Sequence, residues 1–216
     1  GRQAGESGAF LVGIASLFTA YSQEALATAR SVKSFLPSCR VVLGGHHPTA
    51  LPAEAMACPA VDFVIRGEGE NALPQLARAL RSGGDLERVP GIVFRRPDGS
   101  LHLSPPAVVM DLDGCPQPAR DLIDARFYRR RRRGSTVVVA SRGCPMTCSY
   151  CCMGADAYLT YRRRSVASVL GEIEDAVTRF GPGFIDFEDE NISLQRRWFL
   201  ELLAGIEARF GRRGIE

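Results

Sequence analysis

The chain has 216 residues, 45% of them hydrophobic and 24% charged, and its formal net charge is +3. This length suits one large domain or two small ones, and this composition is typical of a soluble globular protein. A charge so near balance gives no indication of nucleic-acid binding. The longest apolar run, residues 9–18, is shorter than the about 20 residues that span a bilayer, and no secretory signal opens the chain. We therefore expect a cytoplasmic protein without a membrane span, in which thiols stay reduced.

The first part of the chain alternates short apolar runs with helical patterns. Three runs are typical of buried strands: residues 9–16, 39–45 and 61–67. Helical patterns follow at three places: residues 22–36, 52–56 and 70–83. Strands joined by crossovers of this length pair in parallel and carry helices on both faces of the sheet. The series begins almost directly on a strand, so we expect an α/β unit that is truncated at its front.

Small residues follow each predicted strand of this unit at its carboxyl end. Ser16 follows the first strand, and Gly44 and Gly45 end the second. Gly67 ends the third, within the sequence RGEGE. Ligands of open parallel sheets bind at this edge, and glycine there lets the backbone approach a ligand closely. The pattern therefore predicts a binding site along this edge.

A hairpin and a connector follow the first unit. Residues 91–104 are typical of a β-hairpin that turns at Gly99. The proline-rich stretch after it has little periodicity and ends in the arginine run 129–133, which is typical of a solvated loop. We predict three segments of the chain: residues 1–88, 89–134 and 135–216.

The third segment begins a second α/β series. Its predicted strands cover residues 135–141 and 184–187, and its predicted helices cover residues 165–181 and 194–211. Ser165 is placed to cap the first of these helices, and Gly181 is placed to end it. The series contains two strand–helix units.

Four cysteines follow the strand that opens this series: Cys144, Cys148, Cys151 and Cys152. Zinc sites normally take their ligands from two separated segments, and no second cysteine pair is present. Cys151 and Cys152 are adjacent, so their side chains diverge and three usable thiolates remain. An iron–sulfur cluster held by three cysteines leaves one iron open to a ligand. An electron carrier with four cysteine ligands, or a zinc-binding interaction domain, stays an alternative.

The sequence CPMTCSYC matches the CxxxCxxC signature of the radical S-adenosylmethionine superfamily, and FIDFEDENIS resembles the second barrel strand of the same superfamily. Upstream, VVLGGHHPTALP and VDFVIRGEGENAL resemble the cobalamin-binding domain that precedes the barrel in one large subclass. The resemblance covers nearly the whole chain. It implies a Rossmann-like cobalamin-binding unit followed by the first two βα units of a partial (β/α)6 barrel.

The resemblance assigns roles to residues around the cysteines. It implies three ligands of a [4Fe–4S] cluster: Cys144, Cys148 and Cys151. It implies contacts to S-adenosylmethionine from Tyr150 through its backbone, from Asp189 and Glu190, and from Arg164 or, as an alternative, Arg162. Chelation of the open iron and reduction of the cluster would then cleave the sulfonium to a 5′-deoxyadenosyl radical.

Cobalamin is the third cofactor that the resemblance implies. Four small residues match those along its nucleotide tail, where only small side chains leave room: Ser16, Gly44, Gly45 and Gly67. The Asp-x-His-x-x-Gly loop that supplies a cobalt ligand in cobalamin mutases is absent from the sequence. We expect His46 and His47 to be loop residues.

The resemblance implies a cobalamin-dependent radical enzyme, and in this subclass most often a methyltransferase acting on an unactivated carbon or a phosphorus centre. A radical cyclase or rearrangement enzyme fits the same motifs. The implied partners are a small-molecule or peptide substrate and an electron donor such as flavodoxin or ferredoxin, with no nucleic acid. With two strand–helix units against the six of such a barrel, we expect a segment of a longer protein that does not turn over by itself.

Overall fold

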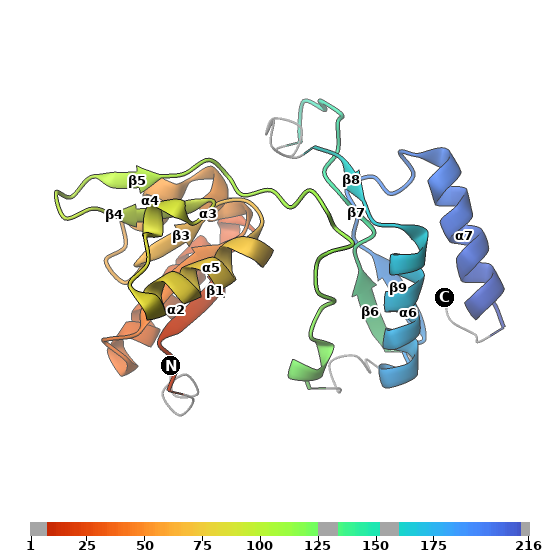
Figure 1. Cartoon of the computed structure of the whole chain (residues 1–216), viewed down its shortest axis with the longest axis horizontal. Helices are drawn as coiled ribbons and strands as arrows, with labels where there is room; N and C mark the ends of the chain where they lie inside the picture. The colour runs from red at the N-terminus through yellow and green to blue at the C-terminus, as the bar shows by residue number, and fades with distance from the viewer. Residues whose placement is uncertain (1–7, 125–133, 152–159, 213–216) are drawn as a thin grey trace. The chain divides into compact units, whose positions relative to one another are not determined.

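The computed structural model describes residues 8–124, 134–151 and 160–212. The chain forms two compact units, and the boundary between them lies between Val109 and Met110 (Figure 1). The arginine run and Cys152 lie outside the described residues. No helix in the described ranges combines the length and the apolar character that a membrane crossing requires.

The first unit is built on a five-stranded sheet in the order β1-β2-β3-β4-β5. Its strands are β1 (Leu11–Ala15), β2 (Arg40–Gly44), β3 (Phe63–Ile65), β4 (Ile92–Arg95) and β5 (Leu101–Leu103). The first three strands pair in parallel, which confirms the prediction from the crossovers. The hairpin β4–β5 pairs with β3 in antiparallel register, so it belongs to this unit and not to the connector segment in which the sequence placed it.

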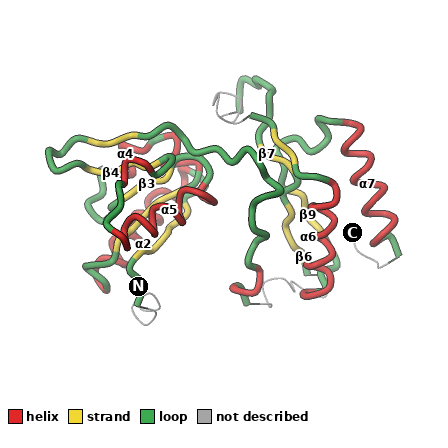
Figure 2. Tube along the Cα trace, in the orientation of Figure 1, coloured by secondary structure: helices red, strands yellow, loops and turns green. Residues whose placement is uncertain are grey.

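Helices cover both faces of this sheet because alternate residues of a strand point to opposite faces. The helices are η1 (Thr19–Tyr21), α2 (Ser22–Phe35), α3 (His46–Ala50), α4 (Pro52–Met56), α5 (Gly69–Ser82) and η2 (Leu86–Arg88). On one face, Val41 and Leu43 pack with residues of α2 and α4. On the other face, Val42 packs with residues of α5, which crosses in front of the strands in Figure 2.

The second unit has a smaller sheet. Its elements are η3 (Arg120–Leu122), β6 (Ser135–Val138), β7 (Ser141–Arg142), β8 (Arg162–Arg163), α6 (Val166–Phe180), β9 (Phe184–Phe187) and α7 (Arg196–Phe210). Strands β6 and β9 pair in parallel, and β7 pairs with β8 in antiparallel register. Ser165 caps α6 by accepting the Ser168 N–H at 3.1 Å, and Gly181 ends it with a φ of 57°, as predicted.

One hydrophobic core holds the second unit together. Val138 and Ala140, at the end of β6, pack with Ile173 of α6 and Leu202 of α7. Helix α6 lies beside the two strands and α7 lies beside α6 (Figure 1).

Asp62 joins three segments of the first unit. Its carboxylate accepts the Lys33 ammonium at 2.7 Å, the Arg40 guanidinium at 3.0 Å and the Val41 N–H at 2.8 Å. Burial alone would raise the pKa of this carboxyl, but these hydrogen bonds outweigh it and hold the pKa below its usual value. Asp62 thereby fixes the end of α2 to the start of β2.

Asp62→Asn should lower the free energy of unfolding at pH 7 by about 1.5–3 kcal/mol, the range for hydrogen bonds to a charged group. A carboxyl with a lowered folded-state pKa contributes stability above its unfolded pKa of about 3.9 and loses it as the pH falls through the folded value. The difference from the unchanged chain should therefore shrink below about pH 4. Urea unfolding at pH 7 and pH 3 measures it, with the exposed Glu54→Gln as the control. A difference that does not depend on pH would contradict the assignment.

Candidate cofactor sites

A cavity of about 380 Å³ lies at the carboxyl ends of β1, β2 and β3. Five glycines line it together with apolar side chains: Gly13, Gly44, Gly45, Gly67 and Gly69. The structure therefore brings together three of the small residues that the sequence predicted at this edge. Ser16 directly follows the lining residue Ala15.

The glycines that line this cavity are required for different physical reasons. A Cβ at Gly45 would lie 2.6 Å from the Ser16 carbonyl oxygen, and a Cβ at Gly67 would lie 2.2 Å from the Ala107 carbonyl oxygen. Both residues also have a positive φ, which disfavours any side chain. At Gly44 the nearest atom to an added Cβ is the Ile65 carbonyl oxygen at 3.9 Å. Gly44 thus leaves space in the cavity, whereas Gly45 and Gly67 allow backbone segments to approach each other.

Ser16 supplies an unused polar group beside this cavity. The residue is 2% exposed, and its Oγ has no hydrogen-bond partner among the described residues. A buried hydroxyl without a partner is costly, so a polar ligand at this edge would satisfy it. The small residues that line the cavity and this hydroxyl are compatible with an extended polar ligand that lies along the edge of the sheet. His46 and His47 were expected to be loop residues, but both lie in α3. His46 is exposed, and the Nδ1 of buried His47 lies 3.3 Å from the Thr19 hydroxyl.

The cysteine loop begins directly after β7. Gly143 has a φ of 79° and turns the chain into Cys144. Cys148 is exposed, Cys144 and Cys151 are half-buried, and the Cys151 N–H donates to the Cys148 carbonyl at 3.0 Å. Among the described residues, no three His, Cys, Asp or Glu side chains lie close enough together to hold one metal ion. The three free thiols are the donor type of an iron–sulfur cluster, and their convergence on one cluster stays a prediction.

The acidic residues after β9 contact the backbone that enters this loop. Asp189 accepts the Ala140 N–H at 3.1 Å, the Ser141 hydroxyl at 2.6 Å and also the Ser141 N–H. Glu190 accepts the Gly143 N–H at 3.1 Å. Both residues were predicted to hold the amine of S-adenosylmethionine. The structure gives each of them backbone donors, and the contact with S-adenosylmethionine stays a prediction.

The environment of Asp189 shifts its ionisation. Burial raises the pKa of this carboxyl above its usual value. Hydrogen bonds from Ser141 and Ala140 oppose the rise, and the charge of the neighbouring Glu190 adds to it. Ser141, which is fully buried, is therefore part of the site, although its place before the cysteines is the only signal for it in the sequence.

Arg164 lies in a buried group of charges. Its guanidinium pairs with Glu172 and donates to the Ser168 Oγ at 3.0 Å and the Val139 carbonyl at 3.2 Å. Arg120 of the connector also pairs with Glu172, which is 2% exposed. A role of Arg164 at S-adenosylmethionine stays a prediction, and it requires an exchange of these bonds. Tyr150, whose backbone was predicted to contact adenine, has a side chain that is 90% exposed.

The residues that the sequence did not identify are glycine and polar residues without a motif of their own. Gly13 lines the cavity from the middle of β1, where an isolated glycine in a strand is the available signal. The Tyr161 hydroxyl is buried beside β8, and burial raises its pKa above the usual value. Glu172 follows the spacing of an ordinary helix, and only the fold shows its two arginine partners.

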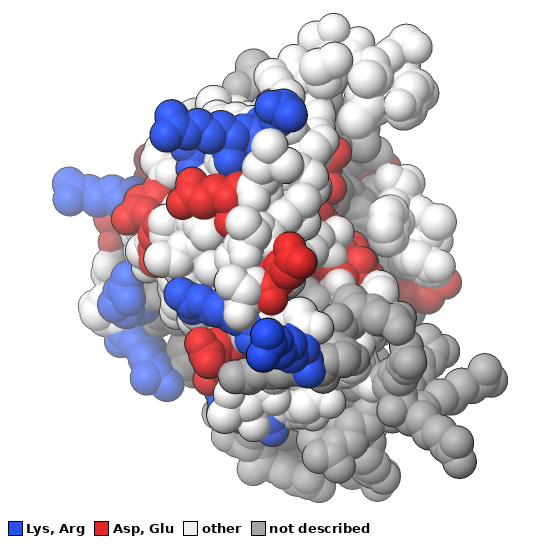
Figure 3. Space-filling view, turned by 90° about the vertical axis from the view of Figure 1, so that its right-hand side faces the viewer, with Lys and Arg blue, Asp and Glu red and all other residues white. Residues whose placement is uncertain are grey.

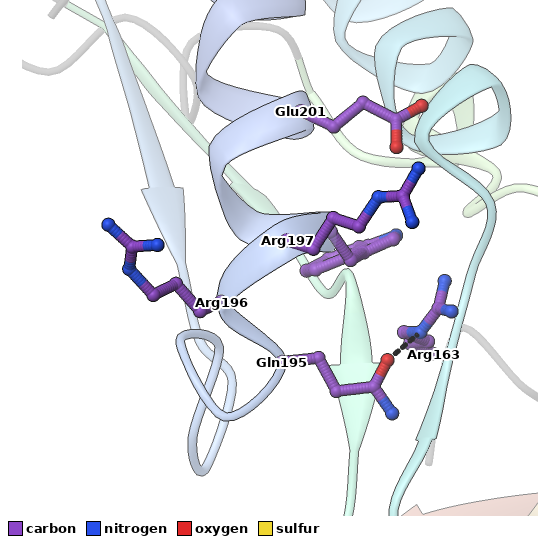
Figure 4. Close-up of a pocket in the computed structure, with 6 residues that line it drawn as sticks. Arg163, Gln195, Arg196, Arg197 and Glu201 are labelled. Atoms are coloured by element: carbon purple, nitrogen blue, oxygen red, sulfur yellow. Dashed lines mark hydrogen bonds between the residues drawn. The ribbon is translucent and has the colours of Figure 1, made fainter.

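A second hollow, of about 480 Å³, lies at the start of α7. Arg163 donates to the Gln195 side chain at 2.6 Å, and Arg196 points away from Arg163 and Arg197 (Figure 4). Glu201 lies one turn beyond Arg197 on the same helix (Figure 4). None of the predicted site residues lines this hollow.

Charges of both signs are mixed on the surface of the second unit. Arg179 lies 3.3 Å from Asp175 and 3.5 Å from Asp121, and Arg209 lies 3.7 Å from Glu174. The face in Figure 3 shows basic and acidic side chains next to one another, separated by uncharged ones. Exposed pairs of this kind contribute little to stability.

Known proteins resemble both units. Residues 2–77 match the B12 binding domain family. An uncharacterized methyltransferase of Pyrococcus horikoshii is 30% identical over 194 residues, which cover 89% of this chain and 42% of that protein. The anaerobic magnesium-protoporphyrin IX monomethyl ester cyclase of Cereibacter sphaeroides is 30% identical over 194 residues, which cover 87% of this chain and 31% of that protein. The chain thus spans less than half the length of these relatives.

A solved structure has the same fold. The radical S-adenosylmethionine methyltransferase TsrM of Kitasatospora setae, with cobalamin and a [4Fe–4S] cluster bound, superposes with a TM-score of 0.73. The match covers 98% of this chain and 43% of that chain, at 24% identity. Mixed α/β units with parallel strands therefore occur in the same order in both proteins.

Gly67→Ala should lower the free energy of unfolding by about 3 kcal/mol, because it combines a strained φ with a clash against Ala107. Gly99→Ala is the matched control, since Gly99 has a similar φ of 84° and no atom within 4 Å of an added Cβ. Its cost should be about 1 kcal/mol, from the conformation alone. Urea unfolding followed by circular dichroism compares the two, and equal costs would contradict the close approach at Gly67.

Proposed function

We propose that this chain, whose residues 2–77 match the B12 binding domain family and whose fold resembles that of a radical S-adenosylmethionine methyltransferase, forms the cofactor-binding part of a cobalamin-dependent radical methyltransferase. The observation that carries the proposal is the presence in one chain of a B12-binding domain and a CxxxCxxC loop that follows the parallel strand β6 by way of the short strand β7. The substrate is an unactivated carbon or phosphorus centre of a small molecule or peptide, and a flavodoxin or ferredoxin supplies the electron.

Cobalamin binds in this proposal at the carboxyl edge of β1, β2 and β3. Gly44 leaves the room that the nucleotide tail needs, and the Ser16 hydroxyl donates to the tail or accepts from it. Gly45 and Gly67 allow neighbouring backbone segments to pack closely around the cavity, and this is the reason that both positions need glycine. The apolar side chains that line the cavity exclude water from the bound tail.

The cluster and S-adenosylmethionine bind in this proposal at the loop after β7. Cys144, Cys148 and Cys151 hold the cluster, and the backbone near Tyr150 contacts the adenine. When bound, the reduced cluster supplies the electron that cleaves the sulfonium, and cobalamin supplies the methyl group. The chain's own contribution is to hold three thiolates on a loop whose entry is fixed by Asp189 and Glu190.

Strands β6 and β9 with helices α6 and α7 are, in this proposal, the first two βα units of a (β/α)6 barrel. Their parallel pairing and the packing of both helices in one core support it. The likeness to TsrM over 98% of this chain supports the same arrangement.

A radical cyclisation is the second candidate function. The similarity to the magnesium-protoporphyrin IX monomethyl ester cyclase of Cereibacter sphaeroides favours it. Both candidates need the same cluster, and product analysis separates them: a methylated product supports the first and a new ring without an added methyl group supports the second.

Gly44→Leu should weaken cobalamin binding by about tenfold or more, which corresponds to about 1.4 kcal/mol, because its side chain occupies the cavity. Gly44→Ala should weaken it less. Gly171→Leu is the control, because Gly171 lies in α6 and its added Cβ meets no atom within 4 Å. Equilibrium dialysis with hydroxocobalamin measures the affinity, and unchanged binding by Gly44→Leu would place the ligand elsewhere.

Each of Cys144→Ala, Cys148→Ala and Cys151→Ala should lose the visible absorbance of the cluster after anaerobic reconstitution, because each removes one iron ligand. Cys115→Ala and Cys152→Ala should keep it. In the unchanged chain, addition of S-adenosylmethionine should alter the electron paramagnetic resonance spectrum of the reduced cluster, since it binds the open iron. A spectrum that is indifferent to S-adenosylmethionine would favour an electron carrier.

A further inference from the structure

The parallel ladder between β6 and β9 ends before the backbone of β6 enters the cysteine loop. The last backbone bond of this ladder runs from the Glu188 N–H to the Val138 carbonyl at 3.3 Å. The chain beyond Val138 continues through buried Ala140 and Ser141. Buried backbone N–H groups need acceptors, and the neighbouring strand offers no further carbonyls at this point.

Two carboxylates take the place of those carbonyls. Asp189 accepts the N–H groups of Ala140 and Ser141, one on each of its oxygens, and it also accepts the Ser141 hydroxyl. Glu190 accepts the Gly143 N–H, one residue before the first cysteine. From Ala140 to Gly143, side-chain carboxylates thus accept the backbone N–H groups in place of strand carbonyls.

The other side of the same backbone is held by β8. Ser141 pairs with Arg163 across β7 and β8, and the Arg164 N–H donates to the Ala140 carbonyl at 2.9 Å. The segment from Ala140 to Gly143 is therefore bound on two sides. Its direction, and the point at which Cys144 begins, follow from these bonds.

We propose that Asp189 and Glu190 are positioning residues that fix the entry of the cysteine loop, and that Asp189 does so with both carboxylate oxygens in place of binding the S-adenosylmethionine amine. Glu190 uses one oxygen in the same way and keeps an exposed side chain. The inference rests on the proposed function for the identity of the group that the loop holds. The hydrogen bonds themselves are independent of it.

Amide hydrogen exchange in the 216-residue chain without cofactors tests the hydrogen bonds alone. Asp189→Asn should speed exchange at Ser141 by at least about fivefold, because an amide offers one acceptor where the carboxylate offers two. Glu190→Ala should do the same at Gly143, whereas Glu190→Gln keeps an acceptor oxygen and should leave that rate near the unchanged value. Glu188→Gln is the matched control, an exposed carboxylate of the same loop.

Amides of α6 report global unfolding of the same unit, so their rates separate a local effect from a variant that folds poorly. Accelerated exchange at Ser141 and Gly143 with unchanged rates in α6 supports the inference. Unchanged exchange at both positions in Asp189→Asn and Glu190→Ala would overturn it.

Reconstitution then tests the consequence for the cluster. The Asp189→Asn variant should bind less iron and sulfide per chain than the unchanged chain. The clusters that do form in it should still change their electron paramagnetic resonance spectrum when S-adenosylmethionine is added. A variant with a full cluster but a weakened response would show that Asp189 binds the amine, and would overturn the inference. If the unchanged chain held no cluster, the proposed function would fail, and the exchange rates alone would decide the positioning role.

Discussion

The chain that follows β6 carries backbone donors beyond the end of the parallel ladder with β9, and the entry to the cysteine loop depends on how these donors are satisfied. A buried N–H without an acceptor costs about 1–3 kcal/mol. Asp189 and Glu190 supply the missing acceptors, so the chain leaves β6 in one direction and reaches Cys144 at one place. The acidic residues after β9 therefore have structural partners in this unit.

Buried charged groups in the second unit are also satisfied by partners within the protein. Glu172 is buried and pairs with both Arg120 and Arg164, so none of the three charges relies on solvent. Arg120 belongs to the connector, and its bond to the Thr136 hydroxyl at 3.0 Å joins the connector to β6. A stretch with little periodicity is thus tied to the sheet that precedes the cysteines.

Close backbone approach shapes the first unit. Gly45 passes against the carbonyl of Ser16, and Gly67 passes against that of Ala107. These contacts bring the ends of the parallel strands together around a cavity that Gly44 leaves open. The two units thus place their proposed cofactors by the same rule, at the carboxyl ends of parallel strands.

The sequence alone determined the order of strands and helices, the parallel pairing, the caps of α6 and the edge at which small residues gather. These features depend on local pattern and on crossover length, which a linear sequence contains. The sequence indicated the β4–β5 hairpin itself but not its pairing with β3, because that pairing is a contact between distant segments. Only the tertiary structure showed that Asp189 meets backbone donors 48 and 49 residues away, that Arg164 is committed to Glu172, and that Gly44 differs from Gly45. Each of these depends on what lies within a few ångströms in space, and the identity of a residue does not contain that information.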